Sequence, residues 1–281
     1  MTRARILSVL SAAVVGALMV GALPAAAAPA PALATVTSLP TTTSTVTVSL
    51  DGRSFSARLV QPAGSAPGAY PVVAFGHGFT QSSSRYSSVL TALAARGYVV
   101  IAPDSETGLF PNHGRFADDL WRSLRWVRAT QGNASATLDA VAGHSMGGGA
   151  ALVAADRYPT IDTVATLAAA ETNPSATTAS AGVTVPALYV VGSQDTVVRP
   201  ATTRAMYDRK PSPATFATIT GGYHCGFVDS SSFLGLGCDS GTISRSTQLS
   251  ITRTLLGNWF DARLRGAPAG ATPAGVVVIS K

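Results

Sequence analysis

Residues 138–152 decide the fold of this 281-residue chain, and they read Leu-Asp-Ala-Val-Ala-Gly-His-Ser-Met-Gly-Gly-Gly-Ala-Ala-Leu. An apolar run that predicts a strand leads directly into Gly143-His144-Ser145-Met146-Gly147, and small residues typical of a tightly packed helix follow. A serine between two glycines at such a strand-to-helix turn is typical of a nucleophile, because the tight backbone leaves almost no room for neighbouring side chains. The helix would also point N–H groups and the positive end of its dipole at a developing oxyanion. We therefore interpret Ser145 as a catalytic nucleophile.

An ordinary glycine-rich turn, or a phosphate-binding loop, is the competing interpretation of this stretch. A phosphate loop would require Gly-Lys-Ser/Thr, or Gly-x-Gly-x-x-Gly with an acidic residue about twenty positions later. The sequence has neither pattern here, which favours the nucleophile.

A serine hydroxyl is a weak nucleophile and needs a base, which a carboxylate holds in place. Along the chain of such a fold the order is serine, acid, histidine. His224 is the one histidine after Ser145, and it lies in Gly221-Gly222-Tyr223-His224 just past an expected strand. It is therefore the predicted base. His144 adjoins the nucleophile; we expect it to pack or hydrogen-bond locally and to lie at the substrate site.

The predicted acid is Asp195, which follows the expected strand 185–191. Active-site groups of open α/β sheets gather at the carboxyl ends of the strands, and Asp195 lies at such an end. Glu171 also follows an expected strand, so it remains an alternative acid.

Short apolar runs alternate with helical patterns along the whole chain, which predicts an α/β fold with a mainly parallel central sheet flanked by helices on both faces. Asp51-Gly52 between the alternating stretches 45–50 and 53–60 predicts a β-hairpin. No repeat or second domain is evident. We expect a catalytic domain at residues 45–266, a flexible leader rich in Pro, Ala, Ser and Thr at 29–44, and a tail at 267–281.

The first 28 residues are typical of a signal peptide. Arg3 and Arg5 precede an apolar run from Ile6 to Leu23, and alanines at 25–28 offer cleavage sites. The alternative is a membrane anchor, since this run is just long enough to cross a bilayer. Serines and glycines within the run favour cleavage, so we expect a secreted chain without a stable membrane anchor.

Composition excludes some functions. The formal net charge is +6, and no Lys/Arg cluster accompanies it, so nucleic acid is not an expected partner. The two cysteines, Cys225 and Cys238, are expected to form a disulfide in an oxidising compartment; a free thiol or a metal ligand beside His224 are the alternatives. The cysteines and histidines lack zinc spacing. We expect no metal, no cofactor and a monomer.

The second oxyanion donor should come from the loop after an early strand. Phe75-Gly76-His77-Gly78-Phe79-Thr80 follows the expected strand 71–75, so the N–H groups of Phe79 and Met146 are the candidate pair. A plain turn is the alternative interpretation of His77-Gly78.

Together, Gly78-Phe79-Thr80-Gln81-Ser82-Ser83, the Ser145 elbow through Gly149, the Asp195 loop and Gly221-Gly222-Tyr223-His224 resemble the actinobacterial cutinase-like polyester hydrolases. The resemblance runs from about Val72 to the C-terminal helix. It implies an α/β-hydrolase fold without a lid or cap domain, and an esterase with Ser145, Asp195 and His224 as its triad. It also implies Phe79 as one wall of the acyl site.

The sequence departs from that family in three places. Residues 168–175 contain no tryptophan where the family has one that clamps an aromatic acyl group. The family's C-terminal disulfide is replaced by cysteines that bracket the histidine loop, and Asp104-Ser105-Glu106-Thr107 is unfamiliar. The chain is therefore predicted to be a secreted serine ester hydrolase that acts on aliphatic polyesters or on short to medium acyl esters. Alternatives are an esterase of the dienelactone hydrolase or chlorophyllase type, a secreted serine peptidase, or a catalytically silent polymer-binding domain.

Overall fold

The computed structural model describes residues 38–64, 67–230 and 238–281. The expected signal peptide and most of the expected leader lie outside these residues. Within the described ranges, no helix is both long and apolar enough to cross a membrane.

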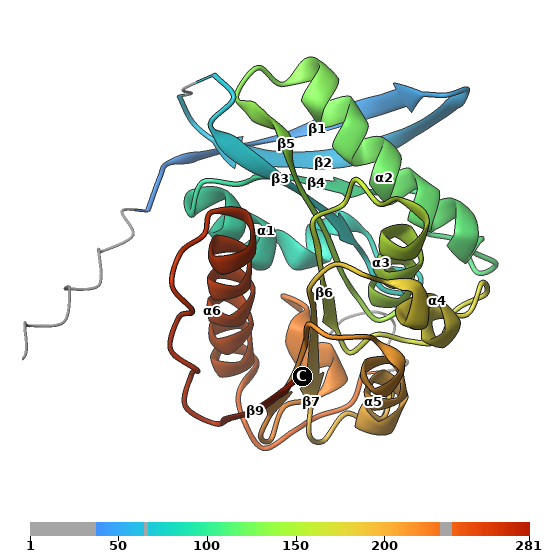
Figure 1. The fold of residues 1–281 in the computed structure, drawn as a ribbon, viewed down its shortest axis with the longest axis vertical. Helices are drawn as coiled ribbons and strands as arrows, with labels where there is room; N and C mark the ends of the chain where they lie inside the picture. Colours follow the sequence, from blue (N-terminus) through green and yellow to red (C-terminus); the bar gives the residue numbers. More distant parts are fainter. Residues whose placement is uncertain (1–37, 65–66, 231–237) are drawn as a thin grey trace, which may run out of the picture. The chain divides into compact units, whose positions relative to one another are not determined.

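In the described part of the chain, nine strands form one sheet in the order β1-β2-β4-β3-β5-β6-β7-β8-β9 (Figure 1). The six strands from β4 to β8 in that order are parallel. The three others, β1, β2 and β9, pair antiparallel. The predicted, mainly parallel sheet is confirmed. The strands are β1 (Thr41–Leu50), β2 (Arg53–Pro62), β3 (Tyr70–Gly76), β4 (Val99–Pro103), β5 (Ala134–His144), β6 (Thr163–Leu167), β7 (Ala187–Gly192), β8 (Ala214–Ile219) and β9 (Val276–Ser280).

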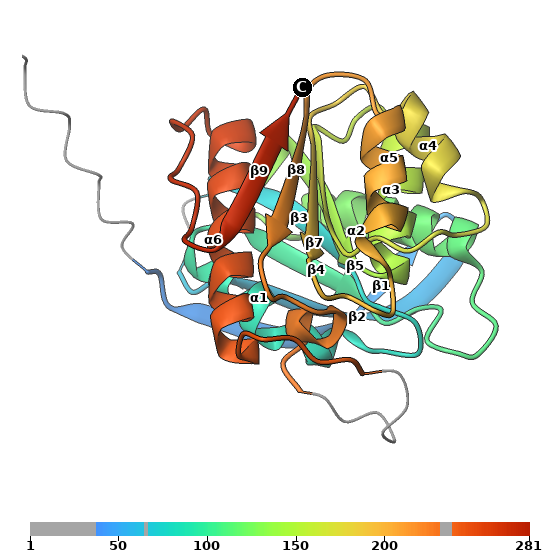
Figure 2. The same ribbon diagram turned by 90° about the horizontal axis from the view of Figure 1, so that it is seen from below.

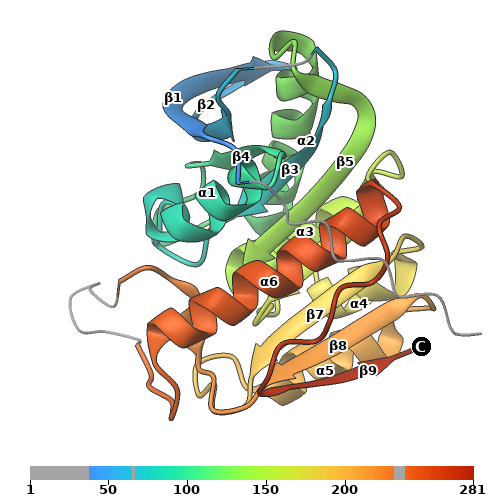
Figure 3. The same ribbon diagram turned by 90° about the vertical axis from the view of Figure 1, so that its left-hand side faces the viewer.

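Helices cover both faces of the sheet, as predicted. Two helices, α1 and α6, lie together on one face, and α2, α3, α4 and α5 follow one another on the opposite face (Figures 2 and 3). Each face buries its own apolar cluster against the sheet. The helices are α1 (Ser87–Ala95), α2 (His113–Thr130), α3 (Met146–Arg157), α4 (Ala176–Gly182), α5 (Pro200–Arg209) and α6 (Arg245–Leu264), with short 3₁₀ helices η1 (Ser83–Tyr86) and η2 (His224–Phe227).

The predicted hairpin forms at the start of the sheet. Asp51 and Gly52 both have positive φ, 51° and 72°, which a two-residue hairpin turn of type I′ requires. Strand β1 begins at Thr41, inside the segment expected to be a flexible leader. The Ser/Thr-rich composition indicated flexibility, but threonine is β-branched and suits an extended strand that pairs with β2.

The sheet also extends beyond the other expected end of the domain. Residues 267–281 were expected to form a tail, yet β9 lies within them and pairs with β8. Its short run of valine and isoleucine has high β propensity, and the partner strand supplies the hydrogen bonds. Helix α4 was not predicted either, because its Ala, Thr, Ser and Gly residues give no apolar periodicity.

Strand order positions the site. From β3 the chain passes to β4 on one side and then to β5 on the other. Ligands in open α/β sheets bind at the carboxyl ends of strands where the order reverses in this way. Gly76 at the end of β3 lies in register with Gly143 at the end of β5. The loops that follow β3 and β5 therefore start side by side.

Candidate active site

Ser145 lies at the turn between β5 and α3. Its backbone angles are φ 55° and ψ −119°, a conformation that costs a non-glycine residue free energy and that the surrounding structure must hold in place. Ser145 is 8% exposed and lines a pocket of about 400 Å³. The sharp turn predicted for Ser145 is confirmed.

The glycines of the turn are required by close backbone contacts. A Cβ atom on Gly143 would lie 2.3 Å from the carbonyl oxygen of Gly147, and one on Gly147 would lie 2.2 Å from the carbonyl carbon of Gly76. No side chain fits at such separations. The end of β3 is thus packed directly against the first turn of α3, which brings the loop containing Phe79 beside Ser145.

Two amides near Ser145 are free to donate. Neither the N–H of Phe79 nor that of Met146 donates a hydrogen bond to any residue that the structure describes. Met146 directly follows Ser145, and Phe79 lines the same pocket as Ser145. These are the two amides expected to bind an oxyanion.

His224 is bonded to the predicted acid. Its Nδ1 lies 2.8 Å from Oδ2 of Asp195, and the side chains are 7% and 0% exposed. Oδ1 of Asp195 accepts hydrogen bonds from the amides of Val197 (2.9 Å) and Val198 (2.7 Å). A carboxylate can only accept, so Nδ1 donates, and Nε2 of the neutral ring is left without a proton. Such a ring can act as a base through Nε2.

Glu171, the alternative acid, is engaged elsewhere. Its carboxylate accepts hydrogen bonds from the amide and the hydroxyl of Thr177 at the start of α4. Asp195, and not Glu171, is therefore the carboxylate in contact with His224.

His144 is buried beneath the pocket, where it packs against His224 with 4.5 Å between the ring centroids. Its Nδ1 lies within hydrogen-bond distance of the Tyr86 hydroxyl. Burial and the neighbouring His224 hold the pKa of His144 well below its usual range, so its ring is neutral. His144 both bonds locally and lines the pocket, as expected of it.

Cys225 and Cys238 are bonded to each other, as expected. The bond joins the residue after His224 to Cys238, and both cysteines line the pocket. The predicted disulfide is confirmed.

The mouth of the pocket is apolar. Phe79, Leu109 and Val197 line it while remaining 48%, 69% and 47% exposed, and the neighbouring Phe110 is 96% exposed. Large exposed apolar side chains usually mark a binding surface when they gather in one place. The part of the pocket lined by Phe79, Leu109 and Val197 is therefore suited to binding an apolar group.

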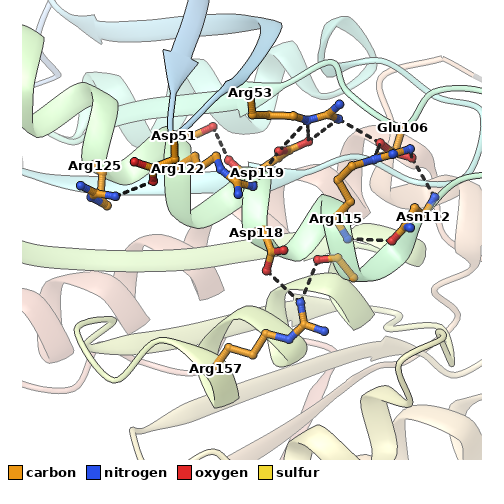
Figure 4. Close-up of polar contacts among 12 residues, drawn as sticks. Asp51, Arg53, Glu106, Asn112, Arg115, Asp118, Asp119, Arg122, Arg125 and Arg157 are labelled. Atoms are coloured by element: carbon orange, nitrogen blue, oxygen red, sulfur yellow. Dashed lines mark hydrogen bonds and ion pairs between the residues drawn. The ribbon is translucent and has the colours of Figure 1, made fainter.

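A network of ion pairs anchors the loop that carries Leu109 and Phe110 (Figure 4). Glu106, whose φ is 58°, accepts hydrogen bonds from Arg53 (3.0 Å), from Arg115 (2.5 Å) and from the amide of Asn112 (2.7 Å). Arg53 is also paired with the buried Asp119 of α2. The unfamiliar loop that begins at Asp104 is thus fixed to β2 and α2.

Sequence reasoning missed several residues around the site. Leu109 lines the pocket, Tyr86 bonds to two residues of the pocket lining, and Asp239 bonds to the loops that contain the predicted acid and base. All of these are tertiary contacts. The apolar pair Leu109-Phe110 between Gly108 and Pro111 was the one local signal available for a loop at a binding surface.

Comparisons with known proteins are consistent with this geometry. A profile of PET hydrolase-like proteins matches residues 21–237. Chlorophyllase-1 of Arabidopsis thaliana is 34% identical over 110 residues, which cover 36% of this chain and 34% of that protein. The chloroplastic Chlorophyllase-1 of Citrus sinensis is 31% identical over 161 residues, 50% of this chain and 48% of that protein. Esterase YjfP of Escherichia coli K12 is 37% identical over 124 residues, 38% of this chain and 48% of that protein. The matched regions thus span no more than about half of these curated relatives.

Proposed function

We propose that this chain, which belongs to the PET hydrolase-like family and has the α/β-hydrolase fold, is a secreted serine carboxylic-ester hydrolase with Ser145, His224 and Asp195 as its triad. The observation that carries the proposal is the 2.8 Å contact between His224 Nδ1 and Asp195 Oδ2, beside a serine held at a strained turn in the same pocket.

The first half of the reaction forms an acyl-enzyme. Ser145 Oγ attacks the carbonyl carbon of the ester while its proton passes to Nε2 of His224. Asp195 stabilises the resulting imidazolium through Nδ1. The N–H groups of Phe79 and Met146 bind the oxyanion of the tetrahedral intermediate. The intermediate collapses, and the alcohol leaves with the proton from Nε2.

The second half repeats these steps with water. Nε2 takes a proton from water as the water oxygen attacks the acyl carbon. Collapse of the second intermediate returns the proton to Ser145 Oγ and releases the carboxylic acid. Every proton taken by His224 is thus given back within one turnover.

Esters with an apolar acyl group are the proposed substrates. The exposed side chains of Phe79, Leu109 and Val197 at the pocket mouth support this class. A chain-length series of p-nitrophenyl esters, together with aliphatic and aromatic polyester films, measures the preference. Hydrolysis of the aliphatic film in preference to the aromatic one is expected, because residues 168–175 supply no aromatic clamp.

A chlorophyllase-type esterase is the second candidate, and the matches to two plant chlorophyllases favour it. Turnover of chlorophyll at a rate well above that of p-nitrophenyl butyrate would support this candidate over the first. Turnover rates of ester and peptide substrates, compared at equal concentration, distinguish both candidates from a peptidase.

Secretion and the monomeric state belong to the same proposal. The N-terminal pattern of residues 1–28 and the Cys225–Cys238 disulfide support an oxidising compartment outside the cell. Mass spectrometry of the protein from culture medium tests secretion by detecting cleavage near residue 28. Size-exclusion chromatography tests the monomeric state. The reaction as proposed needs no cofactor, metal or nucleic acid.

The decisive test is Ser145→Ala. We expect turnover of p-nitrophenyl butyrate to fall by about 10³-fold or more, and labelling by a fluorophosphonate to disappear. Ser54→Ala, at an exposed serine of β2, is the matched control and should change neither. Intact turnover in the Ser145→Ala protein would reject the proposed nucleophile, and a wild-type chain that neither labels nor hydrolyses esters would reject the proposed mechanism.

A further inference from the structure

Asp239 lies outside the predicted triad, yet its carboxylate bonds to both loops that carry the acid and the base. Oδ2 accepts hydrogen bonds from the amide of Thr196 and from the amide of His224, each at 3.0 Å. Oδ1 accepts a third, also at 3.0 Å, from the amide of Cys225. Thr196 directly follows Asp195. One side chain therefore joins the residue after the acid to the base itself.

We propose that Asp239 is a positioning residue for ester hydrolysis, and that its carboxylate holds the Asp195 loop against the His224 loop. The inference rests on the proposed function, because it assigns Asp239 a role only through the contact between Asp195 and His224.

A carboxylate suits this position. Three N–H donors converge on it, and an ionised aspartate has two oxygens that only accept. Hydrogen bonds to a charged acceptor are also stronger than those between neutral groups. An asparagine of the same shape would offer one oxygen and would turn an NH₂ group toward an N–H donor. The charge and both oxygens are thus used.

The disulfide places the carboxylate. Cys238, next to Asp239 in the chain, forms the disulfide with Cys225. The amide of Cys225 in turn donates a hydrogen bond to Asp239. Just beyond, the amide of Thr242 donates to the carbonyl of Gly221 at 3.0 Å. A Cβ atom on Gly241 would lie 2.1 Å from that same carbonyl oxygen. The segment around Asp239 is therefore fixed to the His224 loop on both sides.

Other contacts between the two loops lie closer to the strands. The amide of Gln194 donates to the carbonyl of Gly222, and the amide of Gly221 donates to Oγ of Ser193, each at 2.8 Å. Both precede the catalytic pair in the chain. Asp239 accepts hydrogen bonds from Thr196 and His224, at and just after the catalytic pair. In the same region Asp195 accepts hydrogen bonds from the amides of Val197 and Val198. Loss of Asp239 would therefore loosen the acid and the base relative to each other without separating the strands.

Asp239→Asn and Asp239→Ala in the full chain test the proposal. A misplacement of about 1 Å at a catalytic group can lower a rate by about 10²-fold. We expect kcat on p-nitrophenyl butyrate to fall about 10- to 100-fold in Asp239→Asn and further in Asp239→Ala, with KM changed by less than about threefold. The downfield proton resonance of His224 Nδ1–H should shift or broaden in both variants.

Asp162→Asn is the matched control. Asp162 also accepts a hydrogen bond from a backbone amide, that of Asp139 at 2.8 Å, but it precedes β6 at the opposite edge of the sheet. It should leave kcat and the Nδ1–H resonance unchanged. All assays are run well below the melting temperature of each variant, so that a loss of folded protein does not lower kcat.

A double-mutant cycle tests the part played by the disulfide. Cys225→Ser/Cys238→Ser and Asp239→Ala should lower kcat by less together than the product of their separate effects, because both act on the position of one carboxylate. Multiplicative effects would overturn the role of the disulfide. A folded Asp239→Asn protein with kcat within twofold of wild type and an unshifted Nδ1–H resonance would overturn the role of Asp239. Fluorophosphonate labelling of the wild-type chain tests the activated nucleophile without any change at Asp239 or the disulfide, so either failure can be told apart from failure of the proposed function.

Discussion

The hydroxyl group of Tyr86 lies 2.9 Å from Nδ1 of His144. The same hydroxyl accepts a hydrogen bond from the amide of Gly78 at 2.8 Å. Burial raises the pKa of Tyr86, so the hydroxyl stays protonated and can donate a hydrogen bond to Nδ1 of His144. The side chain of Tyr86 therefore connects the residue before Phe79 with the residue before Ser145. The two loops it joins are those whose amides are proposed to bind the oxyanion.

Tyr86→Phe should weaken both the fold and the reaction. It leaves the buried amide of Gly78 and Nδ1 of His144 without a partner, and each such loss costs about 1–3 kcal/mol. Urea denaturation should show the lower free energy of unfolding, and kcat should fall while KM stays nearly constant. Tyr70→Phe, at a half-buried tyrosine at the start of β3, is the control. A folded Tyr86→Phe protein with unchanged kcat would show that the oxyanion loop does not depend on this hydroxyl.

Asp195→Asn should abolish most of the activity. An amide at this position can present its NH₂ to Nδ1 and favour the wrong tautomer of His224, so kcat should fall by about 10⁴-fold. Glu171→Gln is the control, because the Glu171 carboxylate bonds to Thr177 and not to His224. Steady-state kinetics of both variants decide between the two acids: a large loss in Glu171→Gln with little loss in Asp195→Asn would reverse the assignment.

Phe110→Ser should separate soluble from insoluble substrates. The side chain is 96% exposed beside the pocket mouth, so its replacement should change stability by no more than about 0.5 kcal/mol. Hydrolysis of a polyester film or an emulsified long-chain ester should decline, while turnover of soluble p-nitrophenyl butyrate should not. Val277→Ser removes an exposed apolar side chain from β9 and serves as the control. Equal losses on both substrates would argue against a surface-binding role.

The stability of the chain should depend on Asp139 between about pH 4 and pH 7. Burial raises the pKa of Asp139 to about 7; Arg128, at 2.6 Å, opposes this shift, and the Asp162 carboxylate adds to it. In that pH range the folded chain holds a proton on Asp139 that the unfolded chain has released, so this group lowers the free energy of unfolding as pH rises.

Asp139→Asn should therefore be more stable relative to wild type at pH 8 than at pH 5. Urea denaturation at both pH values measures the difference. Asp208→Asn, at an exposed carboxylate of α5, is the control. An identical difference between Asp139→Asn and wild type at the two pH values would show that Asp139 is ionised throughout and that its pair with Arg128 prevails.

Features encoded by adjacent residues could be predicted from the sequence. The turn at Ser145, the hairpin at Asp51-Gly52 and the strand before Asp195 each depend on a few consecutive residues whose backbone preferences agree with the fold. Chain order then predicted the contact between His224 and Asp195, because parallel strands end at the same edge of the sheet.

Features that depend on distant partners could not be predicted in this way. Asp239 follows a glycine-rich stretch, and nothing near it in the sequence indicates three converging amides. Glu106, in the loop after β4, bonds to Arg53 at the start of β2. The short apolar run of β9 resembles many exposed tails until β8 is known to lie beside it. In each case the tertiary contact, and not the local pattern, determines the role of the residue.

Strand β9 has a practical consequence for anyone who shortens the gene. A recombinant enzyme trimmed at residue 266, where the domain was expected to end, would keep every proposed catalytic residue and still lose the last strand of the sheet. The uncovered β8 would then present unpaired N–H and C=O groups next to apolar residues such as Phe216, which is the kind of edge that recruits other chains. Aggregation during expression, and not inactivity, would be the expected sign of such a truncation.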